Sequence, residues 1–510
     1  MTERRKRYLR RKEEKERKTE ELIKSGVIKK VIYEEREQKK ALPNRKSNLS
    51  TVAGELEDRQ KTAENATAIY YKMLSVLLPK LAQIKDPRNP LKIKHKITTL
   101  LIYGCLISML HIGSRRNANR ELSTPIVFEN LKTMFPDLET IPHADTLARL
   151  LERVEVSEIQ DSMIELLKTL IKKKKFNNYL YKKSFIIAVD GTQKFFRGYK
   201  WSDECLKRHV GGEKRIPQYY CYVLEAVMIL GNGIVLPVTS EFVDDIKYNS
   251  PEEKQDCEIK GFYRLAYKLK KIFRNMKIIL VADGLYACGP VITKCREYKW
   301  QYMICLKKDR IPNVWKEALA LMKINPENSL KCYWGDREQI YKWANAIEYE
   351  YLIGKIKKRE ILNVVICNET WEENHSRSTK KIEFKETQYA WLSSKEITEK
   401  NVFTMCTKIA RGRWKIENNI LKEKHQGYEY EHCYSYNWNA MKGFQYLMKI
   451  GHFLNALATN SEILIEKVNE LGIRGFINSI KKICEGSPLD KYRIENARNR
   501  RFNWKLDLAA

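Results

Sequence analysis

Apolar residues recur at helical spacing toward both ends of the chain and at strand spacing in its middle. From about Ala66 to Lys175 they fall three and four residues apart, which predicts a series of amphipathic helices. The same spacing returns at Thr398 and continues, with breaks, to the end of the chain. We therefore expect helical regions on either side of a central region with a different structure.

The central region contains short runs rich in β-branched and aromatic residues, which are typical of strands. Five such runs precede residue 310, at 184–190, 219–230, 233–243, 277–283 and 302–306. Helical spacing follows the third and the fourth run, so the order is β-β-β-α-β-α-β, which predicts a mixed sheet with helices packed on it. Aromatic-rich runs between residues 310 and 395 predict a second group of strands joined by charged loops.

One uncharged stretch, Ile97 to Ser114, is as long as a membrane-spanning helix. Its Thr and Ser residues and His111 predict a buried helix of a globular fold instead. No apolar segment follows the basic N-terminus, so we expect no secretory signal. The 12 cysteines are scattered without a C-x-x-C pair, as in a reduced protein. These features favour a cytoplasmic protein that does not contact a membrane.

The charge balance points to a polyanionic partner. The chain has 95 Lys and Arg against 64 Asp and Glu, a formal net charge of +31. Such an excess favours binding to phosphates, because each neutralised phosphate releases condensed counterions. The first 50 residues are especially rich in charge, and both a solvated tail and a DNA-contacting arm fit this composition.

Three acidic residues have the placement that metal-dependent phosphoryl transfer needs. Two of the predicted strands end in Asp-Gly, at Asp190 and Asp283, and Glu417 lies in a predicted helix. Side chains at strand ends gather in the crevice of an open α/β sheet. Carboxylates are the hard oxygen ligands that Mg²⁺ prefers, and phosphoryl transfer uses two such ions.

Basic residues accompany Glu417 at helical spacing. Arg413 precedes it by four residues and Lys424 follows it by seven, so the three are expected on one helical face. This face could hold a metal ligand between two phosphate contacts. An ordinary surface Arg–Glu pair is the alternative.

The stretches 185–306 and 411–432 resemble bacterial insertion-sequence transposases of the DDE group. These enzymes have an RNase H-like core and a helix motif of tyrosine, arginine, glutamate and lysine. The resemblance implies that Asp190, Asp283 and Glu417 are the catalytic and metal-binding acids. It also matches Arg413 and Lys424 with the arginine and lysine of the motif. Ala410 stands at the tyrosine position, so the family's aromatic contact with DNA does not carry over.

The resemblance implies an α/β fold with an RNase H-like mixed-sheet core, a β-rich insertion, a helical N-terminal region and a helical C-terminal tail. The expected parts are a basic, partly disordered arm (1–65), a helical DNA-binding region (66–180), the first part of the core (181–309), the insertion (310–397), the last core helix with Glu417 (398–450) and a helical C-terminal region (451–510).

The implied activity is cut-and-paste transposition. Two Mg²⁺ ions, or Mn²⁺ as a substitute, would support cleavage at the ends of the element in double-stranded DNA and strand transfer into target DNA. A homodimer in a synaptic complex, a hairpin step and an association with the bacterial nucleoid are also implied. A catalytically inactive DNA-binding derivative and a nuclease that only hydrolyses DNA stay open as alternatives.

Further residues are candidates for contacts around this site. Lys307 and Lys308 follow the fifth predicted strand and are expected to face the same crevice, and Trp414 precedes Glu417. We expect these three residues to contact DNA, and solvated loop lysines are the alternative for Lys307 and Lys308. In the insertion, Trp334 and Trp343 could stack on a displaced base, although packing in the core fits them better.

Four scattered residues could in principle bind zinc. They are Cys205, His209, Cys221 and Cys257. Their spacing matches no close-set zinc motif, and buried free thiols are the favoured interpretation of the cysteines.

Overall fold

The computed structural model describes residues 3–25, 31–36, 42–44, 46–212, 215–231, 233–244, 257–353, 355–374 and 382–500. The chain forms two compact units, each built from two stretches of sequence. Unit 1 consists of Met1–Lys40 and Ile278–Arg413, and unit 2 of Ala41–Lys277 and Trp414–Ala510.

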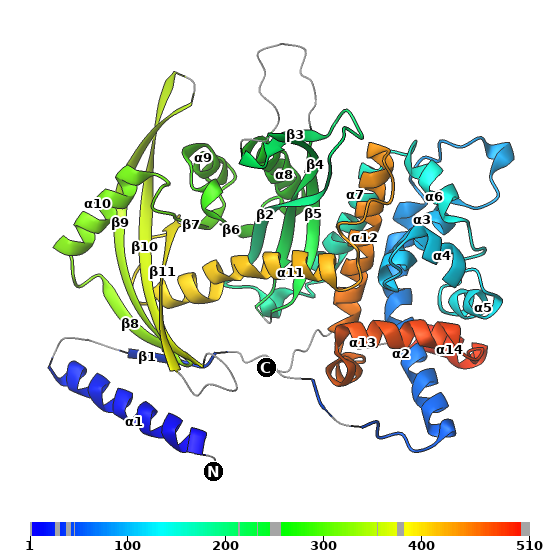
Figure 1. Cartoon of the computed structure of the whole chain (residues 1–510), viewed down its shortest axis with the longest axis horizontal. Coiled ribbons are helices and arrows are strands. Elements are labelled where there is room, and N and C mark those ends of the chain that lie inside the picture. Colours follow the sequence, from blue (N-terminus) through cyan, green and yellow to red (C-terminus); the bar gives the residue numbers. More distant parts are fainter. Residues whose placement is uncertain are drawn as a thin grey trace. The chain divides into compact units, whose positions relative to one another are not determined.

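Unit 2 contains the helical regions predicted at both ends of the sequence. Its helices outside the sheet region are α2 (Val52–Leu81), α3 (Ile97–Met109), α4 (Arg115–Glu121), α5 (Pro125–Met134), α6 (Ala144–Leu151), α7 (Ser157–Lys172), α12 (Trp438–Thr459), α13 (Ile465–Glu485) and α14 (Lys491–Asn499). Short 3₁₀ turns lie at Pro90–Lys92 and Asn177–Tyr179. In this unit α3 packs on α12, and α2 packs on α7 and α14 (Figure 1).

The uncharged stretch forms a buried helix, as predicted. Eleven of the thirteen residues of α3 are buried, because the helix is apolar on all sides and packs against α12. Among the residues that the structure describes, no helix is long and apolar enough to cross a membrane.

The sheet of unit 2 is antiparallel and centres on β4 (Ile216–Ile229). On one edge β4 pairs with β2 (Ser184–Arg197). On the other edge it pairs with β3 (Leu206–Val210) near its start and with β5 (Val235–Val243) near its end. The first three predicted strands are confirmed, whereas the short, charged β3 was not predicted.

Helices cover both faces of this sheet. On β4, Leu224 lies against Gly261 of α8 (Glu258–Phe273), and the next residue, Glu225, contacts Lys449 of α12. Neighbouring residues of a strand point to opposite faces. Hence α8 covers one face and α12 the other, where α11 (Trp414–His425) also packs on β2, β4 and β5 (Figure 1).

Unit 1 contains a mixed sheet in which the predicted second group of strands is continuous with the end of the first. Its strands, in sheet order, are β1 (Val31–Glu34), β8 (Ser329–Trp334), β9 (Arg337–Ile353), β10 (Ile356–Asn374), β11 (Ile382–Ser393), β7 (Gln301–Cys305) and β6, which starts at Lys277 and ends at Ala282. The pairs β1–β8 and β6–β7 are parallel, and the other neighbours in this order are antiparallel. The predicted mixed α/β class is therefore confirmed.

The helical segments of unit 1 differ in part from the prediction. They are α1 (Glu3–Lys24), α9 (Gly289–Glu297), α10 (Pro312–Ile324), a 3₁₀ turn (Gly284–Tyr286), a π-helix (Thr404–Ile409) and a 3₁₀ segment (Ala410–Arg413). Helix α10 and strand β1 were not predicted. The single helix expected from Thr398 is instead a π-helix, a 3₁₀ segment and then α11, so Arg413 precedes the regular helix that contains Glu417.

Glycine permits the close contact between α3 and α12. A Cβ atom on Gly451 would lie 2.9 Å from Cβ of Ser108 and 3.1 Å from the carbonyl oxygen of Cys105. We expect Gly451→Val to lower the free energy of unfolding by about 1–3 kcal/mol, because α12 must move away from α3. Urea denaturation measures the change. Gly198→Val is the control, since nothing lies within 4 Å of a Cβ atom there, and equal losses in both variants would contradict this account.

Candidate active site

Asp190 lies in the middle of β2 and is half-buried. The prediction that it ends a strand is wrong, because β2 continues to Arg197 through its pairing with β4. Asp190 pairs with Glu225 across the two strands, and paired residues project to the same face of a sheet. Asp190 therefore lies on the face that α11 and α12 cover. The neighbouring Gly191 faces α8, and a side chain there would collide with the ring of Tyr222.

Helix α11 brings Glu417 to the same unit and the same sheet. Ile416 and Ile420 are buried where α11 packs on β2, and Glu417 beside them is half-buried. Near the end of the helix, Nζ of Lys424 donates a hydrogen bond to the carbonyl oxygen of Gln193 at 3.2 Å. Lys424 thus attaches α11 to β2 three residues beyond Asp190. It also forms an ion pair with Glu431 at 2.8 Å, for which a phosphate would have to compete.

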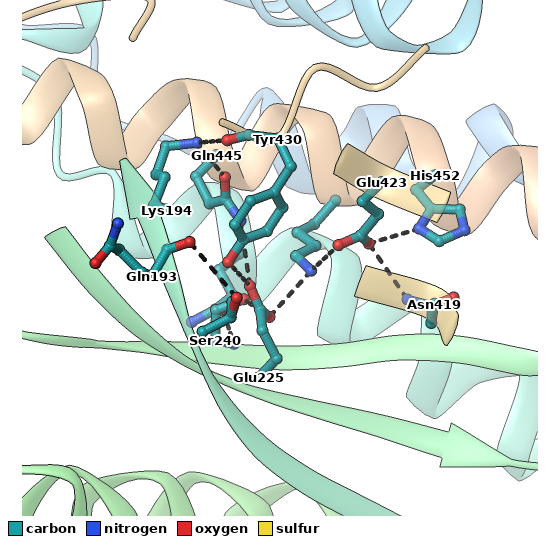
Figure 2. Close-up of polar contacts among 12 residues, drawn as sticks. Gln193, Lys194, Glu225, Ser240, Asn419, Glu423, Tyr430, Gln445 and His452 are labelled. Atoms are coloured by element: carbon teal, nitrogen blue, oxygen red, sulfur yellow. Dashed lines mark hydrogen bonds and ion pairs between the residues drawn. The ribbon is translucent and has the colours of Figure 1, made fainter. Parts of the chain in front are cut away.

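A buried polar network joins β4 to the helices above it (Figure 2). Its first carboxylate, Glu225, accepts hydrogen bonds from the hydroxyl groups of Ser240 at 2.6 Å and Tyr430 at 2.8 Å. The side-chain amide of Gln445 donates a third at 3.2 Å, and Nζ of Lys449 lies 3.0 Å away. Such partners are required, because a buried carboxylate without them is strongly destabilising.

The second buried carboxylate, Glu423, belongs to α11. Lys449 lies 2.7 Å from it and therefore bridges the carboxylate on the sheet and the carboxylate on the helix. Nδ1 of His452 donates to Glu423 at 2.6 Å, and the amide of Asn419 is 3.4 Å away. The network thus fixes α11, and with it Glu417, on the sheet that contains Asp190.

The charges of the network balance. Burial lowers the pKa of Lys194 on β2 to about 8, so it stays protonated at pH 7, where it donates to the carbonyl oxygen of Tyr430 at 2.5 Å and to Gln445 at 2.8 Å. Burial also lowers the pKa of Lys449, but the two carboxylates outweigh this effect and raise it. Burial lowers the pKa of His452, which leaves its ring neutral at pH 7. Two ammonium groups therefore face the two carboxylates.

Asp283 lies in unit 1, directly after β6, as predicted. Its carboxylate accepts a hydrogen bond from the backbone N–H of Leu285 at 2.9 Å and so caps the 3₁₀ turn Gly284–Tyr286. The parallel neighbour β7 ends at Cys305 beside it. Asp283 therefore lies at the carboxyl ends of two parallel strands, where sites of α/β sheets gather.

Cationic side chains of unit 1 lie at the same strand ends. Burial raises the pKa of the Cys305 thiol, the nearby Arg413 guanidinium lowers it, and the Asp283 carboxylate raises it. Arg413 and Asp283 therefore both lie near the Cys305 thiol. The stem of Lys307 lies against Gly284, with its Cγ 3.0 Å from the position of a Cβ there, and Lys308 is exposed. The Lys307 stem therefore lies beside the residue that follows Asp283.

The segment that contains Arg413 is anchored by another buried carboxylate, in unit 1. Glu369 on β10 is fully buried between Arg337 and Arg411, and Arg411 lies in the 3₁₀ segment before α11. The Arg411 guanidinium also lies 5.1 Å from the ring centroid of Trp334 and 4.4 Å from that of Tyr389. These contacts fix the segment to the sheet of unit 1.

The three tryptophan residues differ in their surroundings. Trp343 is buried with 4% of its surface exposed, which confirms core packing and leaves no face for a base. Trp334 packs between the guanidinium groups of Arg411 and Arg36. Trp414 is 38% exposed at the start of α11.

The four candidate zinc ligands do not come together. Cys205 and Cys221 are buried, as predicted for free thiols, but Cys257 is exposed at the start of α8 and His209 is exposed on β3. In the part of the chain that the structure describes, no three His, Cys, Asp or Glu side chains are grouped as metal ligands, and this applies to Asp190, Asp283 and Glu417 as well as to the four zinc candidates.

The structure divides the predicted site residues between the units. Asp190, Glu417, Lys424 and Trp414 belong to unit 2, and Asp283, Lys307, Lys308 and Arg413 belong to unit 1. Sequence reasoning missed the network around Lys449. Its signal was the spacing of Gln445, Lys449 and His452, which puts three polar residues on one face of a largely buried helix.

Removing the shared cation tests the network. We expect Lys449→Met to lower the free energy of unfolding by about 3–5 kcal/mol, because Glu225 and Glu423 lose their common buried partner. Chemical denaturation measures the loss. In the control, Lys168→Met removes a partly exposed pair with Glu165 on α7, and a change below about 1 kcal/mol is expected. Similar losses in the two variants would contradict the role given to Lys449.

The network also predicts a dependence on pH. Burial alone would raise the pKa of Glu423, but Lys449 and His452 lower it from 4.5 to about 2. The stabilisation from ionised Glu423 is therefore complete above pH 4.5 and is lost as the pH falls toward 2. We expect the stability difference between the wild type and Lys449→Met to narrow over this range. Urea midpoints measured from pH 7 downward test this, and a constant difference would argue against it.

Comparison with known proteins gave no match: no protein-family model matches the chain, and no curated protein matches its sequence.

Proposed function

We propose that this protein is a DNA transposase of the DDE group with an RNase H-like core, which cuts DNA at the ends of a transposable element and joins those ends to target DNA. The observation that supports this proposal most is the packing of α11 on β2, which brings the elements of Glu417 and Asp190 together in unit 2. Asp283 at the end of β6 supplies the third acid, from unit 1.

The donor set suits a divalent metal ion. Carboxylate oxygens are the ligands that Mg²⁺ and Mn²⁺ favour, and Asp190, Asp283 and Glu417 would hold two such ions. When bound, these ions activate the attacking oxygen and stabilise the leaving oxygen.

The basic residues would hold the DNA backbone. Arg413 and Lys307 lie near Asp283 and would contact phosphates around the reacting group, and the exposed Lys308 would extend this contact. Lys424 and Trp414 would do the same on α11. The net charge of +31 would support binding to double-stranded DNA along a wider surface.

The reaction consists of two exchanges of one P–O bond for another. Water first attacks a phosphodiester at the element end, and the bond to the 3′ oxygen breaks, which leaves a 3′-hydroxyl group and a 5′-phosphate. The 3′-hydroxyl then loses its proton, attacks a phosphodiester of the target and displaces the 3′ oxygen there.

Three further features belong to the proposed function. A homodimer would hold two element ends in a synaptic complex, and a hairpin step would release the second strand. The protein would act on the nucleoid in the bacterial cytoplasm.

An excision assay in cells tests the proposal. A marker is placed between the native flanks of the gene, and the wild type, Asp190→Asn, Asp283→Asn or Glu417→Gln is supplied. We expect the wild type to release the marker and each variant to lose at least about a hundredfold of that activity, because a metal ligand is removed. Sequencing of the repaired donor site measures excision.

The matched control is Glu152→Gln, which changes an exposed carboxylate after α6 in the same way and should leave excision unchanged. Binding to the flanks without release of the marker by the wild type would support an inactive DNA-binding derivative instead. Cleavage without joining in a purified reaction would support a nuclease that only hydrolyses.

A further inference from the structure

Exposed aromatic and basic side chains gather where β2 ends. Tyr199 is 57% exposed and Tyr436 is 49% exposed, although tyrosine side chains are usually more buried in a folded protein. Arg197 contacts Tyr436, and Lys207 on β3 and Tyr219 on β4 continue the group across the sheet. We call these five residues the aromatic surface.

The strand register puts this surface on the same face as Asp190. Arg197 pairs with Tyr219, and Asp190 pairs with Glu225, six residues further along β4. An even separation on a regular strand means the same face. On β2 the separation is seven, but the register shifts between Gln193 and Phe195, so that one extra residue in β2 turns Arg197 back to the face of Asp190.

The surface is held by rings and hydrogen bonds. The Arg197 guanidinium lies 5.8 Å from the ring centroid of Tyr436, and its Nε donates to the Tyr436 hydroxyl at 3.3 Å. The hydroxyl oxygens of Tyr199 and Tyr436 are 3.4 Å apart. Beneath them Trp201 stacks on Trp438 with ring centroids 5.5 Å apart. The rings are therefore positioned before any partner binds.

A second cation–aromatic pair extends the surface. Nζ of Lys207 lies 5.7 Å from the ring centroid of Tyr219, and Lys207 itself is exposed. Aromatic faces alternate here with cations that have access to solvent. This combination fits a chain of flat bases joined by phosphates, because bases stack on rings and on guanidinium planes while cations neutralise the backbone.

We propose that the aromatic surface binds unpaired bases of single-stranded or locally opened DNA. This inference rests on the proposed function and specifies its substrate. Paired bases in a duplex are stacked on each other and cannot present their faces, so exposed tyrosines favour an unpaired strand. Six residues of strand correspond to about 20 Å, so the surface would hold DNA several nucleotides from the phosphodiester at Asp190.

Binding of the full-length protein to fluorescent oligonucleotides, measured by anisotropy without divalent metal, tests the inference. The probes are a thymidine 15-mer and a 15-base-pair duplex. We expect the double variant Tyr199→Ala/Tyr436→Ala to weaken binding of the single strand by about tenfold or more, because stacking on each ring is lost. Binding of the duplex should change by less than about twofold, since phosphate contacts dominate there.

Two control variants test whether the loss of binding comes from the rings of these two tyrosines. Tyr199→Phe/Tyr436→Phe keeps the rings and should keep most of the affinity for the single strand. Tyr267→Ala removes another exposed tyrosine, 54% exposed and paired with Lys271 at 4.4 Å, on α8 at the opposite face of the sheet. It should bind the single strand like the wild type. The melting temperature of each variant shows whether it is folded.

Several results would overturn the inference. These are unchanged binding of the single strand by the double Ala variant, equal losses for the single strand and the duplex, and an equal loss in the Phe variant. Loss of self-association with intact DNA binding would make the surface a contact between copies of the chain. Because this assay contains no metal, it is independent of cleavage. If Glu417→Gln still excised the marker, the catalytic proposal would fail while the binding result stood.

Discussion

The position of α11 on its sheet depends on one ammonium group shared by two buried carboxylates. Lys449 reaches Glu225 on β4 and Glu423 on α11, and neither carboxylate is accessible to water. Taking each ion out of water costs several kcal/mol, so the cluster is stable only while its members keep their geometry. An apolar interface would tolerate sliding of the helix, whereas this one fixes its axial position and its rotation. The half-buried Glu417 lies six residues before Glu423 on the same helix, so its position is fixed as well.

Unit 1 also contains a buried carboxylate that is paired with cations, and there the cations are arginines instead of lysines. Glu369 holds Arg411 and Arg337, and the aromatic rings of Trp334 and Tyr389 flank the Arg411 guanidinium. Arg411 and Asn419 are only eight residues apart in sequence, yet each belongs to a buried polar network of a different unit. The short stretch between them contains Arg413, Trp414 and Glu417. The stretch with Arg413, Trp414 and Glu417 is therefore held on each side by a buried carboxylate, Glu369 before it and Glu423 after it.

Local sequence predicted most elements but not where they end. The run 184–190 is rich in β-branched residues and was recognised, but Gly191 resembles a turn, and only the pairing with β4 reveals that β2 continues to Arg197. Strand β3 was missed because its charged residues lack an apolar pattern, and α10 because its region was interpreted from neighbouring aromatic runs. Asp283 was located correctly, since β6 ends within the apolar run that predicted it. The network around Lys449 depends on contacts between residues more than 200 positions apart, which no local pattern encodes.

The extra residue in β2 determines which face of the sheet the rest of the strand presents. Lys194 lies at the register shift, where its side chain turns into the buried network while the strand beyond it changes phase. If β2 kept regular alternation through Lys194, Arg197 would lie on the α8 side and Phe196 on the side of Asp190. Deleting Lys194 would remove the bulge and leave Arg197 on its present face, but the buried network would lose one of its two ammonium groups. The register shift therefore puts Lys194 and Arg197, which are three residues apart, on one face of the strand.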